Sequence, residues 1–295
     1  MQNPNAASET SGAARPSWSQ RSPYHAIAAA SLAGRTPTVA DGLTCLTAPD
    51  DELLLLLDAA FRLRERYFGR DVTLHVLRNA KSGICPEDCG FCSQSTRFKS
   101  AVPRYPMQSV DEIVRGAREA YELRATRYCI VTATRRPTRS DLETVCEAVR
   151  RIKSEMPIQI CASLGLLDER DAATLAKAGV DRFNHNLETS RRYFPEIVGT
   201  HAWEDRAETI RRAKAAGMEA CCGGIIGLGE TTEDRVSLAL ELHELGVESV
   251  PLNFLDPRPG TPLESASRLT PHECLRALAF FRIVHKDKDV RVAGG

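Results

Sequence analysis

Residues 127–163 read RYCIVTATRRPTRSDLETVCEAVRRIKSEMPIQICAS, and this stretch decides the fold. It begins with a short run of residues that favour β-strands, RYCIV at 127–131, and ends with another, IQICAS at 158–163. Ser140 followed by Glu143 has the pattern of a capping box, which predicts a helix between the two runs. A strand, a helix and a second strand in this order form a βαβ unit, whose crossover keeps the strands parallel.

The same alternation of β-rich run and helix repeats along the chain. The β-rich runs lie at 72–77, 127–131, 158–163, 181–186, 219–226, 249–255 and 289–293. Further start signals predict helices after Ser109, Thr231 and Thr270. This pattern fits both a doubly wound sheet and a (β/α) barrel of the TIM type. Because no dinucleotide-binding fingerprint is present, we expect the α/β barrel.

The N-terminal part of the chain is predicted to lie outside this repeat. Residues 1–21 are rich in Ala, Ser, Asn, Pro and Gln and hold one acid, which predicts a disordered tail or, alternatively, an organellar transit peptide. Residues 22–70 are predicted to form a helical extension, because DDELLLLLDAAFRLRERYFG begins with acids and ends with basic residues and Gly69. Residues 71–295 are then the barrel domain.

The charges of the chain balance, with 39 Lys and Arg against 39 Asp and Glu. This balance gives no indication of binding to nucleic acid or to an anionic membrane surface. The longest apolar runs, such as 53–57, are far shorter than the roughly 18 residues that cross a bilayer. Ten cysteines are too few for a disulfide scaffold, and no signal peptide is recognisable. We therefore expect a reducing compartment, the cytoplasm.

Alternate residues of the predicted strands are polar or carry a thiol, although a barrel lumen is normally filled with branched apolar side chains. This polar face carries Arg127, Cys129, Gln159, Cys161, Ser163, Asn184, Asn186, Glu188, Glu219, Cys221, Asn253, Asp289 and Arg291. The opposite faces carry apolar residues such as Tyr128 and Ile160, which suits helices packed outside. Since unpartnered buried polar groups are costly, the pattern predicts a bound group in the lumen, unless these residues pair with one another or lie in loops.

Three cysteines lie close together in SGICPEDCGFCSQSTRF, residues 82–98. Cys85, Cys89 and Cys92 follow the first β-rich run, so we expect them in the first βα loop, at the end of the barrel where active sites lie. Three thiolates suit a 4Fe-4S cluster whose fourth iron keeps an open coordination site. Structural zinc would need a distant fourth ligand, and a thioredoxin-like pair would leave one cysteine unexplained.

The spacing of these cysteines resembles that of the radical S-adenosylmethionine (SAM) superfamily. The resemblance implies that the open iron binds the amino and carboxylate groups of SAM. An electron from the cluster would then cleave SAM to methionine and a 5′-deoxyadenosyl radical, which abstracts hydrogen from unactivated carbon. An enclosed barrel would protect such a radical from solvent.

Longer segments resemble the biotin synthase family: NAKSGICPEDCGFCSQS, NHNLETS, GGIIGLGET and PLNFLDPRPGTPL, within a match from about Asp50 to the last residue. In that family three cysteines and an arginine hold a 2Fe-2S cluster deep in the barrel. Cys129, Cys161, Cys221 and Arg291 match those positions, the arginine being either a ligand or a charge partner. The resemblance implies a sulfurtransferase in which these residues are catalytic. Its reaction would be the insertion of sulfur into dethiobiotin, the final step of biotin biosynthesis.

The resemblance also implies residues that bind the substrates. Asn186 and Glu188 of NHNLETS match positions that contact dethiobiotin and the SAM ribose, although the family usually has Asp at the second position. Asn253 and Arg206 match positions near the substrates, with the arginine facing the SAM carboxylate. A homodimer and an electron donor of the flavodoxin or ferredoxin type are implied as well, with no nucleic acid and no membrane partner.

The chain departs from the family at its end. It stops at Gly295, whereas the family continues for roughly one more strand and its helix. We therefore expect an incomplete barrel of about seven of eight βα units, or a fragment of a longer reading frame. Two other interpretations remain open. One is a related radical SAM enzyme that rearranges a small amino acid and has no inner cluster, and the other is a non-catalytic binding module stabilised by zinc.

Overall fold

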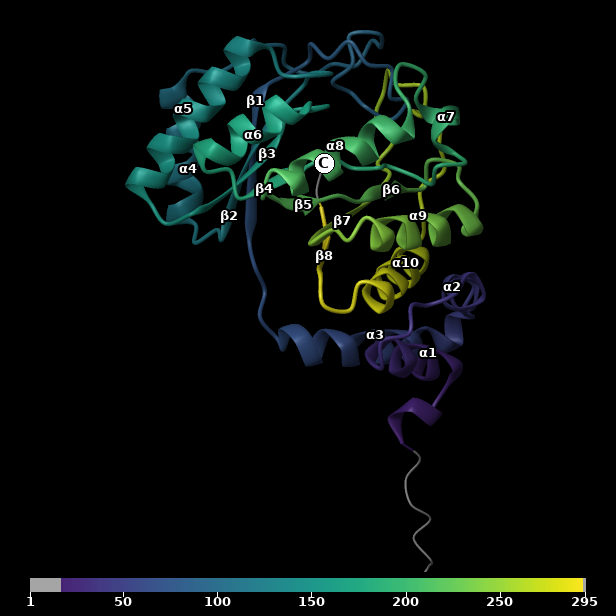
Figure 1. The fold of residues 1–295 in the computed structure, drawn as a ribbon. Coiled ribbons are helices and arrows are strands. Elements are labelled where there is room, and N and C mark those ends of the chain that lie inside the picture. The colour runs from purple at the N-terminus through teal and green to yellow at the C-terminus, as the bar shows by residue number, and fades with distance from the viewer. Residues whose placement is uncertain (1–16, 294–295) are drawn as a thin grey trace, which may run out of the picture.

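A curved sheet of parallel strands forms the centre of the computed structural model, which describes residues 17–293 (Figure 1). The strands are β1 (His75–Lys81), β2 (Arg127–Thr132), β3 (Gln159–Ser163), β4 (Arg182–Asn184), β5 (Glu219–Cys221), β6 (Gly224–Ile226), β7 (Ser249–Phe254) and β8 (Asp289–Val292). Neighbours pair in the order β1-β2-β3-β4-β5-β7, and β6 and β8 also pair with β7. Within residues 17–293, β1 and β8 do not pair. The expected TIM-type barrel is therefore confirmed in its incomplete form.

The predicted β-rich runs all form strands, with two differences in detail. The first run, predicted at 72–77, is a strand at His75–Lys81 and so leads directly into the cysteine loop. The run at 219–226 is divided into β5 and β6. Gly223 lies at the break, where a Cβ atom would stand 1.8 Å from the carbonyl oxygen of Pro251. The close approach of the β7 backbone therefore requires glycine here.

Helices follow the strands and cover the outer face of the sheet (Figure 1). They are α4 (Val110–Glu122), α5 (Arg139–Glu155), α6 (Glu169–Ala178), α7 (Phe194–Ile197), α8 (Trp203–Ala215), α9 (Thr232–Glu244) and α10 (Pro271–Val284). Capping boxes begin α4, α9 and α10 at Ser109, Thr231 and Thr270, as predicted. In each box the side-chain oxygen accepts from the helix backbone, which satisfies an N–H group that has no partner within the helix.

The start of α5 differs from the prediction. Thr138 caps this helix instead of Ser140, and its partner is Asp141 instead of Glu143. Asp141 also accepts a hydrogen bond from Lys81 Nζ at 2.7 Å. Because both side chains are largely buried, this contact joins the helix start to the end of β1 and favours the earlier of the two overlapping boxes.

Helices from the N-terminal part of the chain pack against α9 and α10 (Figure 1). They are α1 (Pro23–Leu32), α2 (Val39–Leu46) and α3 (Leu53–Phe68), with short 3-10 turns at Trp18–Gln20 and Asp50–Glu52. Ser31 Oγ donates to the carbonyl oxygen of Ile283 at 2.7 Å, and Arg276 Nε donates to that of Ala48 at 2.6 Å. Most of the predicted tail, residues 1–16, lies outside the described residues, and the turn at Trp18–Gln20 occupies part of the remainder.

Strand residues alternate between the helices and the lumen. Tyr128, Ile130 and Ile160 are fully buried between the sheet and the helices, as predicted. Their neighbours Cys129 and Cys161 line a cavity on the other face. The apolar core therefore lies outside the barrel, and the lumen is left to polar and thiol groups.

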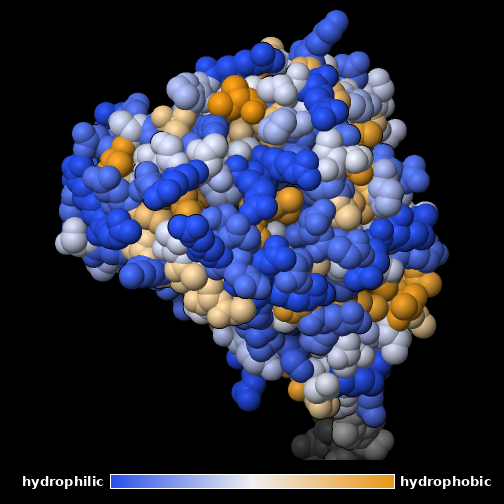
Figure 2. Space-filling model, turned by 45° about the horizontal axis from the view of Figure 1, so that its top comes forward, coloured by the Kyte–Doolittle hydropathy of each residue, from blue (hydrophilic) through white to orange (hydrophobic). Residues whose placement is uncertain are grey.

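Hydrophilic residues cover most of the surface at the end of the barrel where the strands terminate. Figure 2 turns this end toward the viewer and shows hydrophobic residues only in small, separate patches. In the described part of the chain, no helix has both the length and the apolar character required to cross a membrane.

Candidate iron–sulfur and substrate site

The three clustered cysteines lie in the loop that follows β1. Backbone hydrogen bonds fold this loop back on itself, since Cys85 N donates to Gln94 O at 3.1 Å and Thr96 N donates to Cys85 O at 2.8 Å. A tight turn connects the other two cysteines, because Cys92 N donates to Cys89 O at 2.9 Å. The loop stands at the carboxyl ends of the strands, where the sequence predicts it.

Cys85, Cys89 and Cys92 border one cavity of about 280 Å³, together with Glu188 and Arg206. In residues 17–293 no three Cys, His, Asp or Glu side chains converge closely enough to share a single metal ion. An iron–sulfur cluster does not require this convergence, because each cysteine binds a different iron. Burial raises the pKa of all three thiols, that of Cys89 to about 12, so iron binding must displace their protons.

Glu188 faces the same cavity from an unusual backbone conformation. Its φ is 70°, in the left-handed region that residues other than glycine rarely adopt. The residue is 8% exposed, and its Oε2 has no hydrogen-bond partner among the described residues. Burial raises the pKa of this carboxyl. A strained, buried acceptor beside a cavity indicates a ligand-binding position, and its oxygen suits the hydroxyl groups of a ribose.

The guanidinium of Arg206 connects the cysteine loop to Glu188. Its Nη2 lies 3.6 Å from Cys89 Sγ, and its Nη1 lies 3.2 Å from Glu188 Oε1. Nη1 also donates to Asn186 O at 2.8 Å, and Nε donates to His201 Nε2 at 2.9 Å. The sequence predicts that Arg206 faces the SAM carboxylate. In the structure each of its three nitrogens has a protein partner at the edge of the cavity.

A second set of thiols lies deeper in the lumen, on β2, β3 and β5. The strand register places Cys129 beside Cys161, and the Cys161 thiol is close enough to those of Cys129 and Cys221 for both to influence its pKa. Arg291 on β8 reaches the same group, because its Nη2 lies 3.2 Å from Cys221 Sγ. The four residues predicted at the inner cluster are therefore neighbours in space.

Two of the inner thiols, those of Cys129 and Cys161, border a cavity of about 380 Å³ that Arg291 also lines. A neighbouring thiol, that of Cys129 for Cys161 and that of Cys161 for Cys221, acts together with burial to raise the pKa of both residues well above the usual value for cysteine. The charge of Arg291 acts in the opposite direction on both. Three thiols with an adjacent cation are a donor set that fits an iron–sulfur cluster, whose binding would again release protons.

The outer and inner cavities share a wall. Both cavities are bordered by Val131, Ser163, Asn184 and Asn186. Asn186 Oδ1 accepts from Gly223 N at 3.1 Å, which fixes its amide at this wall. Asn253 borders only the inner cavity, where its Nδ2 donates to Gly224 O at 3.3 Å. A substrate bound at the shared wall would lie between the two sets of thiols.

Charged side chains lie two positions before lumen-facing residues on several strands. Arg182 donates to Glu219 Oε2 at 2.8 Å and to Asp289 Oδ2 at 3.1 Å. Arg127 donates to Gln159 Oε1 at 2.5 Å, while its Nε and Nη1 have no partner in residues 17–293. Arg182 is not among the predicted lumen residues, although the two-residue period that predicts Asn184 and Asn186 on this face also includes position 182.

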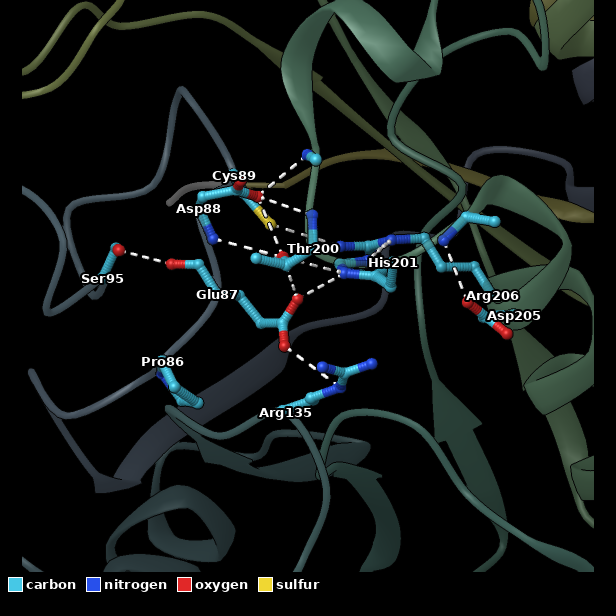
Figure 3. Close-up of polar contacts among 12 residues, drawn as sticks. Pro86, Glu87, Asp88, Cys89, Ser95, Arg135, Thr200, His201, Asp205 and Arg206 are labelled. Atoms are coloured by element: carbon cyan, nitrogen blue, oxygen red, sulfur yellow. Dashed lines mark hydrogen bonds and ion pairs between the residues drawn. The ribbon is translucent and has the colours of Figure 1, made fainter.

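Polar residues beside the cysteine loop form contacts that no pattern in the sequence predicts (Figure 3). Glu87 and Asp88, between the first two cysteines, contact Thr200 and His201, which precede α8. Asp88 Oδ1 accepts from Thr200 N at 3.1 Å, and Glu87 contacts His201 Nδ1. Since 114 positions separate Glu87 from His201, no local spacing in the sequence connects them.

Comparison with known proteins identifies the family. Residues 80–242 match the family model of the radical SAM superfamily, and residues 251–295 match the Biotin and Thiamin Synthesis associated domain. A biotin synthase of Salinibacter ruber is 58% identical over 272 residues, which cover 92% of this chain and 76% of that protein. The chain belongs to the biotin synthase family. A biotin synthase of Halalkalibacterium halodurans is 46% identical over 264 residues, covering 90% of this chain and 79% of that protein.

Solved structures of other proteins share the fold. Methylornithine synthase superposes with a TM-score of 0.80 at 21% identity, covering 90% of this chain and 78% of that one. The FeFe-hydrogenase maturase HydG from Carboxydothermus hydrogenoformans gives 0.77 at 19%, covering 91% and 65%. At these identities the likeness supports the fold alone. Membership in a radical SAM family implies SAM and a 4Fe-4S cluster as cofactors.

Proposed function

We propose that this chain inserts sulfur into dethiobiotin to form biotin. The observation that carries the proposal is the meeting of Cys129, Cys161, Cys221 and Arg291 in the lumen, beside the cavity that the loop cysteines border. One site would activate a carbon–hydrogen bond, and the other would hold the sulfur to be inserted. The shared wall between the cavities would bring one substrate within reach of both.

We assign Cys85, Cys89 and Cys92 as ligands of the 4Fe-4S cluster, and Glu188 and Arg206 to SAM binding. The unpartnered Oε2 of Glu188 supports this assignment, because it can accept a hydrogen bond from a ribose hydroxyl. Arg206 holds the Glu188 carboxylate and Cys89 in a fixed relation. When bound, the cluster and SAM supply the 5′-deoxyadenosyl radical that abstracts hydrogen from carbon.

We assign Cys129, Cys161, Cys221 and Arg291 to a 2Fe-2S cluster that is the source of sulfur. Cys161 is 2% exposed and Cys221 is fully buried, which keeps water away from the reacting sulfur. Arg291 donates to Ser249 Oγ at 2.5 Å as well as contacting Cys221, so its charge is fixed beside the thiol. A fixed cation favours the thiolate form that iron requires.

Dethiobiotin would lie at the shared wall of the two cavities. Asn186 stands at this wall and Asn253 borders the inner side. Their amide groups match the N–H and C=O groups of the ureido ring of dethiobiotin. The proposal further includes a homodimer, an electron donor of the flavodoxin or ferredoxin type, and the reducing environment of the cytoplasm.

Anaerobic reconstitution tests the proposal. The full chain should bind about six irons, four in the outer cluster and two in the inner one, with distinct spectra. Cys129→Ala, Cys161→Ala and Cys221→Ala should each bind about four irons and form no biotin, while still cleaving SAM to 5′-deoxyadenosine. Cys146→Ala, a buried cysteine of α5 outside the lumen, is the matched control and should keep both clusters.

Two results would contradict sulfur insertion. One is an unmodified chain that binds only about four irons although all the inner thiols are present. The other is full turnover of another substrate in the three inner variants, which is the behaviour of a radical SAM enzyme that rearranges its substrate without an inner cluster.

A further inference from the structure

We infer that Glu87 and His201 are positioning residues that hold the Arg206 guanidinium against Cys89, and thereby set the reduction potential of the cluster bound there. The inference rests on the proposed assignment of Cys89 to a 4Fe-4S cluster. It does not depend on which substrate the enzyme uses.

Glu87 and His201 form a buried pair beside the cysteine loop (Figure 3). Glu87 is 6% exposed, and the His201 side chain is 3% exposed. Glu87 Oε2 contacts both His201 Nδ1 and Thr200 Oγ1, and its Oε1 lies 3.3 Å from Arg135 Nε. A carboxylate buried this deeply needs such partners to offset the loss of water. These contacts therefore hold the Glu87 carboxylate in one position beside His201.

The two ring nitrogens of His201 have different roles. Nε2 accepts a hydrogen bond from Arg206 Nε at 2.9 Å. Because Nε2 accepts, the proton of the neutral ring is on Nδ1, where it is donated to Glu87. Glu87 therefore selects the tautomer that Arg206 requires. The opposite tautomer would place two N–H groups against each other.

Arg206 transmits this orientation to the cysteine. Its guanidinium is planar and rigid, so fixing Nε at His201 also fixes the directions of the other nitrogens. Nη2 then points to Cys89 Sγ at 3.6 Å, and Nη1 points to Glu188 Oε1 at 3.2 Å. The contacts thus begin at Glu87 and return to Cys89, two positions later in the same loop (Figure 3).

Other contacts from the same region keep His201 in place. Asp88 Oδ1 accepts from Gly199 N at 2.9 Å and from Thr200 N at 3.1 Å, which fixes the backbone just before the histidine. The ring of Phe194 packs edge-on against His201 at 5.7 Å and lies 5.5 Å from the Arg206 guanidinium. The loop that carries Cys89 therefore also determines where His201 and Arg206 lie.

The expected consequence is electrochemical. A cation that donates to a cysteine sulfur favours the reduced cluster, because reduction adds one negative charge. Loosening Arg206 should therefore make the cluster harder to reduce. A role limited to folding the loop would alter iron loading and leave the potential of the loaded cluster unchanged.

The reduction potential of the 4Fe-4S cluster in the reconstituted full chain, followed by electron paramagnetic resonance without dethiobiotin, measures this effect. In His201→Leu, which removes both ring nitrogens without changing charge, we expect the ratio of reduced to oxidised cluster at a fixed potential to fall about tenfold, or about 59 mV. His201→Gln can accept from Arg206 and donate to Glu87, and should restore most of the difference. Glu208→Gln, on the exposed side of α8, is the matched control and should show no shift.

A double-mutant cycle tests whether His201 acts through Arg206. If it does, His201→Leu combined with Arg206→Gln should have the potential of Arg206→Gln alone. Additive shifts would overturn the inference, as would a His201→Leu potential equal to that of the unmodified chain.

If His201→Leu binds no iron, the potentials of Arg206→Gln and His201→Gln decide. A potential about 59 mV lower in Arg206→Gln, with that of His201→Gln close to the unmodified value, supports the inference. An unchanged potential in Arg206→Gln would overturn it. None of these measurements involves dethiobiotin. A negative result would therefore not contradict sulfur insertion, and the potentials can be measured even if the chain forms no biotin.

Discussion

Arg291 Nη2 lies 3.2 Å from Cys221 Sγ, so a residue of β8 is in contact with a thiol of β5. The positive charge lowers the pKa of this thiol, against the effects of Cys161 and of burial, which raise it. The last described strand therefore contributes to the chemistry of the lumen as well as to the sheet.

Replacing Arg291 by Met tests this contact. We expect the outer cluster to form normally and the inner cluster to form about threefold to tenfold more slowly, because one pKa unit changes the thiolate fraction tenfold. Reconstitution followed by absorbance at about pH 7 and about pH 8.5, near the usual pKa of cysteine, should show partial recovery of the Met variant at the higher pH. Equal rates for both proteins at both pH values would contradict a charge role.

The left-handed backbone at Glu188 predicts that substitutions there affect the stability of the fold and the binding of SAM differently. Glycine adopts a φ of 70° without strain, so Glu188→Gly should be about 1 kcal/mol more stable than Glu188→Ala. Both variants should bind SAM at least about tenfold more weakly, because a charge-assisted hydrogen bond is lost. Urea unfolding and equilibrium SAM binding measure the two effects. Equal stabilities would mean that the backbone is not strained here.

Arg127 and Arg182 form a matched pair of buried arginines, 5% and 4% exposed. Arg127 leaves two nitrogens without partners among the described residues and contacts one carboxylate, that of Glu219, at 3.3 Å, whereas Arg182 bridges Glu219 and Asp289 at shorter distances. We expect Arg127→Met to change the free energy of unfolding by less than about 1 kcal/mol, and Arg182→Met to lower it by about 2 kcal/mol. Denaturant unfolding of the two variants is the measurement. A larger loss of unfolding free energy in Arg127→Met than in Arg182→Met would show that the number of partners does not determine the effect of the substitution.

Substitutions at Gly223 and Gly217 should distinguish the cost of a steric clash from the cost of backbone strain. A Cβ at Gly223 would meet Pro251 O at 1.8 Å, whereas one at Gly217 meets nothing within 4 Å, although its φ is 90°. Gly223→Ala should cost about 3 kcal/mol or more, and Gly217→Ala about 1 kcal/mol. Because Gly223 is two positions from Cys221, its variant should also bind less inner-cluster iron. Similar unfolding midpoints for the two variants would rule out the clash.

His285 predicts a loss of stability in acid. Burial, with smaller effects of His243 and Arg282, lowers the pKa of this fully buried ring to about 3. The unfolded chain takes up a proton below about pH 6.5, where the folded chain does not. This contribution to stability is therefore complete above about pH 6.5 and falls by up to about 1.4 kcal/mol per unit toward pH 3. In His285→Asn the dependence of the unfolding free energy on pH between about 6 and 4 should flatten, and an unchanged slope would contradict the assignment.

Much of the fold follows from local patterns. The capping boxes at Ser109 and Thr270 act between residues three positions apart, so they need no tertiary information. Near Thr138 two such boxes overlap, and the contact of Asp141 with Lys81 decides between them. A capping box therefore predicts the start of a helix from local sequence alone, except where two boxes overlap.

The candidate site divides in the same way. The strand period of two places Cys129 and Cys161 on one face, and the short spacing of the loop cysteines indicates a cluster. By contrast, the contact between Glu87 and His201 joins segments 114 positions apart, and nothing in either segment indicates the other.

The sequence by itself determined the order of strands and helices, the polar face of the lumen and the family to which the chain belongs, because these depend on periodicity and on motifs of adjacent residues. Tertiary structure alone decided that Arg206 is oriented by His201 toward Cys89, that Gly223 interrupts a strand, and that Glu188 adopts a left-handed backbone. The physical reason is that hydrogen-bond geometry and steric contact depend on distances between segments, which only the packed chain defines.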